Sequence, residues 1–143
     1  MTVTTESFTR DAISGKWCLR VGSKFSKNSF CVHIPGSLET PNALAIQVVN
    51  DALYQIESLS RTARKHLRGF FLYLDECPDE TILLTAAEVS SQAEALFLYF
   101  FAESHEYESG LFWVEFSPDP VRGYRAYGFA SCGYGNSAST IRP

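Results

Sequence analysis

Two short segments near the N-terminus alternate hydrophobic and polar residues with the period of a half-buried β-strand. They span residues 16–21 and 29–34, and Pro35-Gly36 ends the second segment. The residues on their apolar sides are Trp17, Leu19, Val21, Phe30, Val32 and Ile34. Glycine, serine and lysine fill the stretch between the two segments, so the pattern predicts a β-hairpin with a basic tip.

In the next segment the apolar residues recur with helical spacing. Thr40-Pro41 has the sequence of an N-cap followed by a proline at the first helical position. The apolar stripe consists of Ala45, Val48, Val49, Ala52, Leu53, Ile56, Leu59 and Ala63. Basic residues crowd the last turns, and Gly69 is placed to end the helix. We predict one long helix, from Pro41 to about Leu67, that covers one face of a sheet.

Five further apolar runs follow this helix, and four of them predict strands directly. Residues 69–74 are apolar on both alternating sides, as in a strand near the centre of a sheet. Residues 75–80 predict an acidic turn that contains a proline, and residues 81–86 return from it as a strand. Residues 111–116 and 124–132 predict two more strands, with a polar turn before the first and a proline-marked turn between the two.

The fifth run, from Ala95 to Ala102, fits either a helix or a strand. Ser91 and Glu94 have the spacing of a capping box, which favours a helix. A helix that is apolar on all sides must be enclosed on every side, however, whereas a strand of this kind only needs a central place in a sheet. We therefore predict a central strand.

Together these elements predict an α+β fold, in which an antiparallel sheet in meander order packs against one long helix. The chain has 143 residues, enough for a single domain with one hydrophobic core that spans residues 1–143. Residues 1–14 and 133–143 have no sustained pattern, so we predict a flexible lead-in and a flexible tail.

Charged residues are distributed unevenly along the chain. Residues 1–68 contain nine Lys and Arg against five Asp and Glu, and residues 122–143 contain three Arg and no carboxylate. Residues 69–121 contain eleven carboxylates and no Lys or Arg, so the net charge of −4 conceals a strongly acidic segment. A surface of one sign steers partners of the opposite sign. The pattern favours a partner protein with a basic surface and argues against direct binding to nucleic acid.

The four cysteines, Cys18, Cys31, Cys77 and Cys132, lack the spacing of a zinc site or a C-x-x-C motif. The N-terminus has no signal-peptide pattern, and no apolar stretch reaches the length of a membrane helix. We therefore expect a cytoplasmic protein with reduced thiols rather than two disulfides, with no metal or cofactor and no membrane association.

Little in the sequence indicates catalysis. Cys31 and His33 lie two residues apart on a predicted strand and so share a face, but no third orienting group can be located. His105 could act with Glu106 or Glu108 as general acid and base, but an exposed polar loop is the ordinary explanation of these residues. Phosphate-loop, G-x-S-x-G and H-E-x-x-H motifs are absent, so we predict that the protein is not an enzyme.

We predict a non-enzymatic acidic interaction protein that binds and inhibits a basic partner, such as a nucleic-acid-directed toxin or a defence enzyme. The small, acidic, motif-free format is similar to that of immunity proteins and anti-defence inhibitors. Carboxylates steer the encounter in such complexes, and aromatic residues anchor them. The candidate contact residues are Asp75, Glu76, Asp79, Glu80, Glu103, Glu106, Tyr107, Glu108, Tyr124 and Tyr127.

Two alternatives remain open at this stage. One is a small-molecule-binding module or small enzyme with an aromatic-lined pocket between helix and sheet. The other is a homo-oligomeric structural protein, in its simplest form a homodimer, that buries its surplus aromatic residues in itself.

Overall fold

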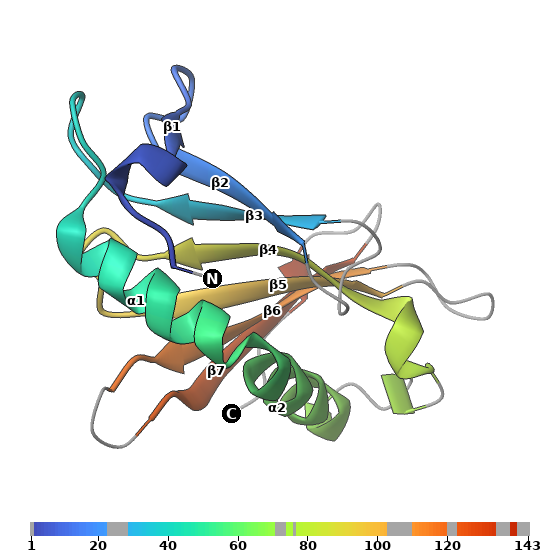
Figure 1. The fold of residues 1–143 in the computed structure, drawn as a ribbon. Helices are drawn as coiled ribbons and strands as arrows, with labels where there is room; N and C mark the ends of the chain where they lie inside the picture. Colours follow the sequence, from blue (N-terminus) through green and yellow to red (C-terminus); the bar gives the residue numbers. More distant parts are fainter. Residues whose placement is uncertain are drawn as a thin grey trace.

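The fold is an eight-stranded sheet with two α-helices, in a computed structural model that describes residues 2–22, 29–70, 74–75, 77–102, 110–119, 123–133 and 138–139. The side chains of Phe70 and of every residue from 127 onward lie outside this description. The strands are β1 (Thr9–Arg10), β2 (Trp17–Gly22), β3 (Ser29–Ile34), β4 (Ile82–Val89), β5 (Leu96–Ala102), β6 (Gly110–Ser117), β7 (Arg125–Gly133) and β8 (Ala138–Ser139). Their order in the sheet is their order in the chain (Figure 1).

The sheet is mixed, which corrects the purely antiparallel meander expected from the sequence. β3 and β4 run parallel, with Cys31 opposite Ala86, and every other neighbouring pair of strands is antiparallel. The helices α1 (Ala43–Tyr54) and α2 (Ile56–Phe70) form the crossover between these two parallel strands. Parallel neighbours require a long connection of this kind, because the chain must return to the end at which the first strand began.

Two helices replace the single long helix that the apolar stripe predicted. The N-cap is Asn42 and not Thr40, since the Asn42 side chain accepts a hydrogen bond of 2.9 Å from the Ala45 amide. α1 ends at Tyr54. Its C-cap is Gln55, whose φ of −120° and ψ of 27° depart from helical geometry, and α2 starts at Ile56. The chain turns at this junction, so that α1 and α2 point in different directions (Figure 1).

The strand predicted for residues 69–74 is wrong. α2 continues through Gly69 to Phe70, and Gly69 does not adopt the positive φ of a glycine that ends a helix. Leu74 is fully buried in a short helical turn, and residues 71–73 lie outside the described part of the chain. Of this run, Gly69 and Phe70 thus belong to α2 and Leu74 to the core, and none of these three residues is in the sheet.

The strand predicted for Ala95 to Ala102 is confirmed as β5, which lies between β4 and β6. The spacing of Ser91 and Glu94 belongs to a tight turn and not to a capping box. In this turn the Ser90 hydroxyl accepts hydrogen bonds of 3.0 Å from the amides of Glu94 and Ala95, and Ala93 has a φ of 57°.

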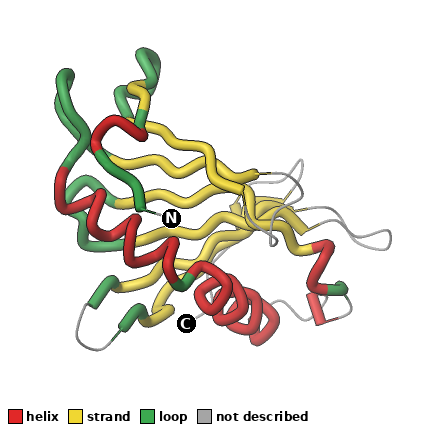
Figure 2. Tube along the Cα trace, viewed as in Figure 1, coloured by secondary structure: helices red, strands yellow, loops and turns green. Residues whose placement is uncertain are grey.

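One face of the sheet packs against the two helices and forms the core (Figure 2). Every second residue of the central strands is buried there, among them Leu98, Phe100, Phe112 and Val114. The buried helix residues are Ala45, Val49, Ala52, Leu59, Ser60, Ala63, Arg64 and Leu67.

The N-terminal segment packs on the same core. Val3 and Phe8 are buried, whereas Ile13 is exposed. The Asn50 side chain on α1 exchanges two hydrogen bonds with the backbone of Val3, of 2.8 Å and 3.0 Å, which fixes this segment along the helix. The predicted tail falls mostly outside the described residues.

Candidate functional site

The face of the sheet opposite the helices carries the alternate residues of the same strands. No α-helix lies over this face within the described ranges, and we call it the open face. Its members are Cys18, Arg20, Cys31, His33, Leu83, Ala86, Glu88, Phe97, Tyr99, Phe101, Leu111, Trp113 and Glu115. Most of these side chains are half-buried, and they stand outside the hydrophobic core cluster.

The strand register arranges the centre of the open face in rows. Glu88, Phe97 and Glu115 stand opposite one another across β4, β5 and β6. Tyr99 and Trp113 form the next row, with ring centroids 6.0 Å apart, and the centroids of Phe97 and Tyr99 are 6.5 Å apart. Three aromatic rings therefore pack together beside two carboxylates, a combination suited to binding cations.

Glu88 is the centre of a polar cluster on this face. Its carboxylate forms an ion pair with the Lys16 ammonium and accepts a 3.0 Å hydrogen bond from the Tyr99 hydroxyl. Burial, with the nearby negative charge of Glu88, raises the pKa of Tyr99 to about 12. Tyr99 therefore remains a neutral hydrogen-bond donor at physiological pH, and it holds the carboxylate in place.

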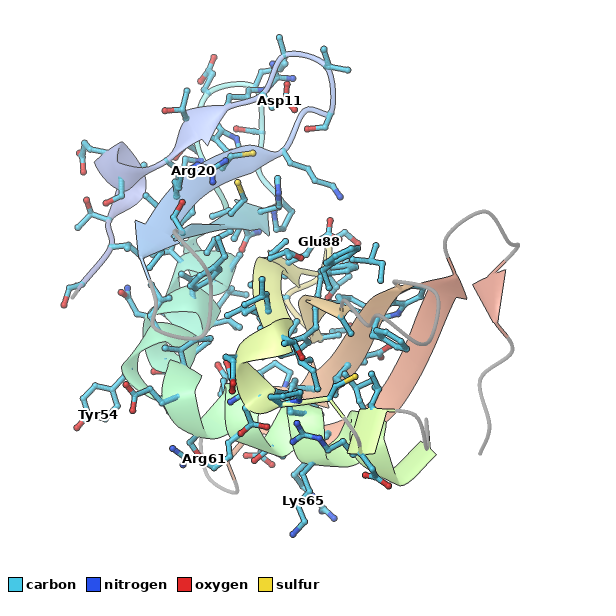
Figure 3. All side chains as sticks on the ribbon, turned by 90° about the vertical axis from the view of Figure 1, so that its right-hand side faces the viewer. Asp11, Arg20, Tyr54, Arg61, Lys65 and Glu88 are labelled. Atoms are coloured by element: carbon cyan, nitrogen blue, oxygen red, sulfur yellow. The ribbon has the colours of Figure 1, made fainter. Side chains whose placement is uncertain are left out.

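A hollow of about 360 Å³ opens beside this cluster, and we call it the open-face hollow. Its lining comes from the β1–β2 turn and from β3, β4, β5 and β6, and consists of Asp11, Ser14, Lys16, His33, Thr85, Ala86, Glu88, Tyr99 and Leu111. In the side view of Figure 3, Asp11 and Glu88 lie well away from Arg61 and Lys65, which project from α2. The hollow is thus on the opposite face from the helix–sheet pocket considered above.

His33 on β3 pairs with a cysteine of the neighbouring strand rather than with Cys31. The Cys18 Sγ atom lies 3.1 Å from His33 Nδ1, because the register places these two residues opposite each other. Burial, with contributions from Asp11 and Cys31, raises the pKa of the Cys18 thiol. A raised pKa keeps the thiol protonated at neutral pH, which weighs against a nucleophilic role.

The predicted acidic turn is anchored to the end of α2. The Arg68 guanidinium donates to the carbonyl oxygens of Leu74 and Cys77, at 3.2 Å and 3.0 Å, and lies 2.5 Å from Asp79 Oδ1. The basic end of the helix therefore neutralises part of the acidic turn. Asp75 and Glu80 are exposed, and they remain available for long-range attraction.

Of the other predicted contact residues, Tyr124 is the one whose side chain the structure describes. Glu76, Glu103, Glu106, Tyr107 and Glu108 lie outside the described residues, as does the side chain of Tyr127. Ala102 is the last described residue before 103–109, and it pairs with Ile82, which follows the acidic turn. The ends of β4 and β5 that adjoin these two acidic stretches of sequence are therefore neighbours in the sheet.

Tyr124 lies at the opposite end of the sheet, beside α1. Its hydroxyl donates a 3.1 Å hydrogen bond to the Val48 carbonyl, and it lines a smaller hollow of about 220 Å³. Burial, with a contribution from Asp51, raises the pKa of Tyr124 strongly. The bonded and half-buried hydroxyl makes Tyr124 a structural residue, separated from the acidic turn by the length of a strand.

The sequence interpretation missed Glu88, Phe97, Trp113 and Lys16 as members of one site. Their alternation within each strand was visible, since every second residue of β5 and β6 faces away from the core. The missing information was the register, which brings β2, β4, β5 and β6 together. Glu88 and Glu115 are the two acidic residues set inside apolar strands of the described sheet, and that position is the signal that could have identified them.

None of the described helices has the length and apolar composition needed to span a membrane. Within the same residues, no three His, Cys, Asp or Glu side chains come together as ligands for a metal ion. The chain matches no protein-family model, no curated protein and no solved structure.

Proposed function

We propose that this chain is a non-catalytic interaction protein that uses the open face to bind a partner protein with a basic surface. The observation that carries the proposal is the cluster of Phe97, Tyr99 and Trp113 between Glu88 and Glu115 on a sheet face without a covering helix in the described ranges. Aromatic residues of this kind are enriched among the anchors of protein interfaces.

The chemistry of the open face matches a basic partner better than an acidic or an apolar one. Carboxylates attract lysine and arginine side chains, and aromatic ring faces attract the same cations. The exposed carboxylates Asp75 and Glu80 support the proposal from outside this face, because they add to the attraction during the encounter. A nucleic-acid-directed toxin or defence enzyme is the class of partner that this surface suits, since such proteins carry basic clefts.

The proposal is tested with the product of the coding sequence next to this one, bound to the immobilised protein. We expect a complex whose dissociation rate rises on the order of tenfold or more in a Trp113→Ala variant, because a central aromatic anchor accounts for much of the binding energy. Tyr54→Phe is the matched control, since Tyr54 is an exposed aromatic residue on the helical side.

A second readout covers the case in which the neighbouring product does not bind. Wild type and Trp113→Ala are used to capture proteins from the lysate of the source cells, and the two sets are compared by quantitative mass spectrometry. Loss of a basic protein with Trp113→Ala supports the proposal. Identical sets for the two variants, together with a monomeric wild type, contradict it.

The open-face hollow favours a second candidate function, the binding of a small molecule. Its volume of about 360 Å³ lies within the range of ordinary ligand pockets. A thermal-shift screen of metabolites separates the two candidates. A metabolite that raises the melting temperature of wild type but not of a Tyr99→Ala variant favours the small-molecule function.

A further inference from the structure

We propose that the open-face hollow binds an arginine side chain of a partner. In the unbound protein, Lys16 forms an ion pair with the Glu88 carboxylate that the arginine would contact. The inference deepens the proposed function and rests on it only in assigning the arginine to the partner. The site itself can be tested with small probes in the absence of any partner protein.

The carboxylate of Glu88 is prepared for a cation from the hollow. The Tyr99 hydroxyl holds Oε1 at 3.0 Å, and the Lys16 ammonium lies on Oε2. The Glu88 side chain is 22% exposed, so it is oriented by its neighbours and yet open to the hollow. A carboxylate has about four lone-pair sites, so Glu88 can accept two N–H donors of a guanidinium while it keeps the Tyr99 bond.

The walls of the hollow suit the rest of an arginine side chain. The Tyr99 ring, which lies 6.0 Å from the tilted Trp113 ring, offers a surface on which a planar guanidinium stacks. Ala86 and Leu111 supply apolar contacts for the methylene stem, and Leu111 is 38% exposed in the absence of a ligand.

The titratable groups at the rim favour a cation as well. Asp11 adds a second carboxylate. Hydrogen bonds from the Ile13 amide and the Ser14 hydroxyl fix this carboxylate in the turn between β1 and β2. His33 faces the same hollow and is engaged with Cys18 at 3.1 Å. Lys16 is the one Lys or Arg among the described lining residues, so its replacement by a neutral residue leaves two carboxylates facing the ligand.

Exchange of Lys16 for an incoming guanidinium is energetically easy. The Lys16 side chain is 47% exposed, so its ammonium can leave Glu88 and become fully hydrated with little change in its surroundings. A guanidinium is more weakly hydrated than an ammonium and loses less on entering the hollow. Lys16 therefore lowers the affinity for arginine without blocking the site.

The direct test is a titration of the ¹⁵N-labelled protein with N-acetyl-arginine N-methylamide, followed by NMR. The matching lysine compound tests the effect of a positive charge without a guanidinium. The matching norleucine compound tests the effect of the aliphatic side chain alone. We expect saturable shifts at the amides of Ala86, Glu88 and Tyr99 and at the Trp113 indole. Arginine should bind more tightly than lysine, and norleucine should give no saturable shift at these positions.

Two variants give opposite results if Lys16 competes with the ligand. Lys16→Met should tighten arginine binding by about threefold to fivefold, because it removes an ion pair of surface strength. Glu88→Gln should weaken it on the order of tenfold. Lys65→Met and Glu94→Gln remove equivalent charges from exposed positions elsewhere, and both should bind the probe like wild type.

The inference is overturned if the shifts map outside the open-face hollow, or if Lys16→Met binds arginine no more tightly than wild type. The latter result means that Lys16 and Glu88 form an internal ion pair only. If Glu88→Gln does not fold, Lys16→Met decides alone, because its side chain is half exposed. Arginine binding in the hollow combined with partner binding that Trp113→Ala leaves unchanged contradicts the proposed function and not this inference.

Discussion

Asp79 links the acidic segment of the chain to the basic end of α2. Its Oδ1 atom lies 2.5 Å from Arg68 and 4.0 Å from Arg64, and the hydrogen bond from Arg68 lowers the pKa of Asp79 below its ordinary value. The folded protein therefore favours the ionised carboxylate. This contribution to stability is present above the pKa of the unfolded chain, about 3.8, and it is lost as the pH falls through the lower folded value.

An Asp79→Asn variant should be less stable than wild type at pH 7, by at most about 1 kcal/mol, because the Asp79 side chain is largely exposed and solvent screens its ion pair. The difference should shrink as the pH falls below about 4, where wild type loses the same charge. Urea unfolding at several pH values measures both effects. Asp75→Asn, in the same turn, is the matched control, and a stability gap that stays constant down to pH 2 would contradict the assignment.

Sequence reasoning at the scale of residues identified partners along a strand but not across strands. It paired His33 with Cys31, two positions away, whereas the structure pairs His33 with Cys18 at 3.1 Å. It also named Asp79 as a candidate contact residue for a partner, because nothing in the sequence shows that Arg68 lies within reach. Contacts across the sheet depend on register, and register is a property of the folded chain.

Among the elements, β5 separates the two faces of the sheet most clearly. Leu98 points to the helices and is fully buried, whereas its neighbour Phe97 points to the open face and is half-buried. We expect Leu98→Asp to prevent folding, since it places an unpaired charge in the core. Leu98→Ala should cost about 2–5 kcal/mol of unfolding free energy.

Phe97→Ser is the matched comparison on the open face, and it should fold with a smaller loss of stability than Leu98→Ala. Circular dichroism and urea unfolding of the three variants measure this order. A folded Leu98→Asp protein would mean that the core face of β5 is accessible to water.

Most elements could be predicted from the sequence because their periodicity is local. The strands around Val21, Val32, Val114 and Leu98 appear where alternation or a two-sided apolar run predicts them. The break at Gln55 could not be predicted, because the stripe from Ala45 to Ala63 continues through it in phase and no glycine or proline marks it. The continuation of α2 through Gly69 and Phe70 was missed for a different reason, since short apolar runs fit several structures.

At the scale of the whole molecule, the distribution of charge should govern how fast a partner arrives. Reversal of Asp75 and Glu80 to lysine should leave the unfolding free energy within about 0.5 kcal/mol of wild type, because both residues are exposed. The association rate at low salt should fall severalfold or more, with little change in dissociation. Asp79 is left unchanged in this variant. Its replacement would break the ion pair with Arg68 and so change the stability of the fold as well as the association rate.

Surface plasmon resonance at about 20 mM and about 300 mM salt measures this effect with any partner identified as above. The Debye length differs roughly three- to fourfold between these two salt concentrations. An association rate equal to that of wild type at low salt would exclude steering by the acidic turn. The dissociation rate should respond instead to Trp113→Ala on the open face.

The parallel pairing of β3 with β4 has a consequence for the order in which the protein can be assembled on the ribosome. Synthesis releases α1 and α2, with their apolar stripe, before β5 and β6 exist to cover it. The sheet can cover the helices only after β4 has paired with β3 across the long connection that contains α1 and α2. Non-local pairing of this kind is slow. A chain ending at Val89 should therefore bind a hydrophobic dye and show little amide protection. The 143-residue chain should bind no dye and should protect the amides of its core strands. A nascent chain of that length is the point in synthesis at which a holding chaperone has the most apolar surface to shield.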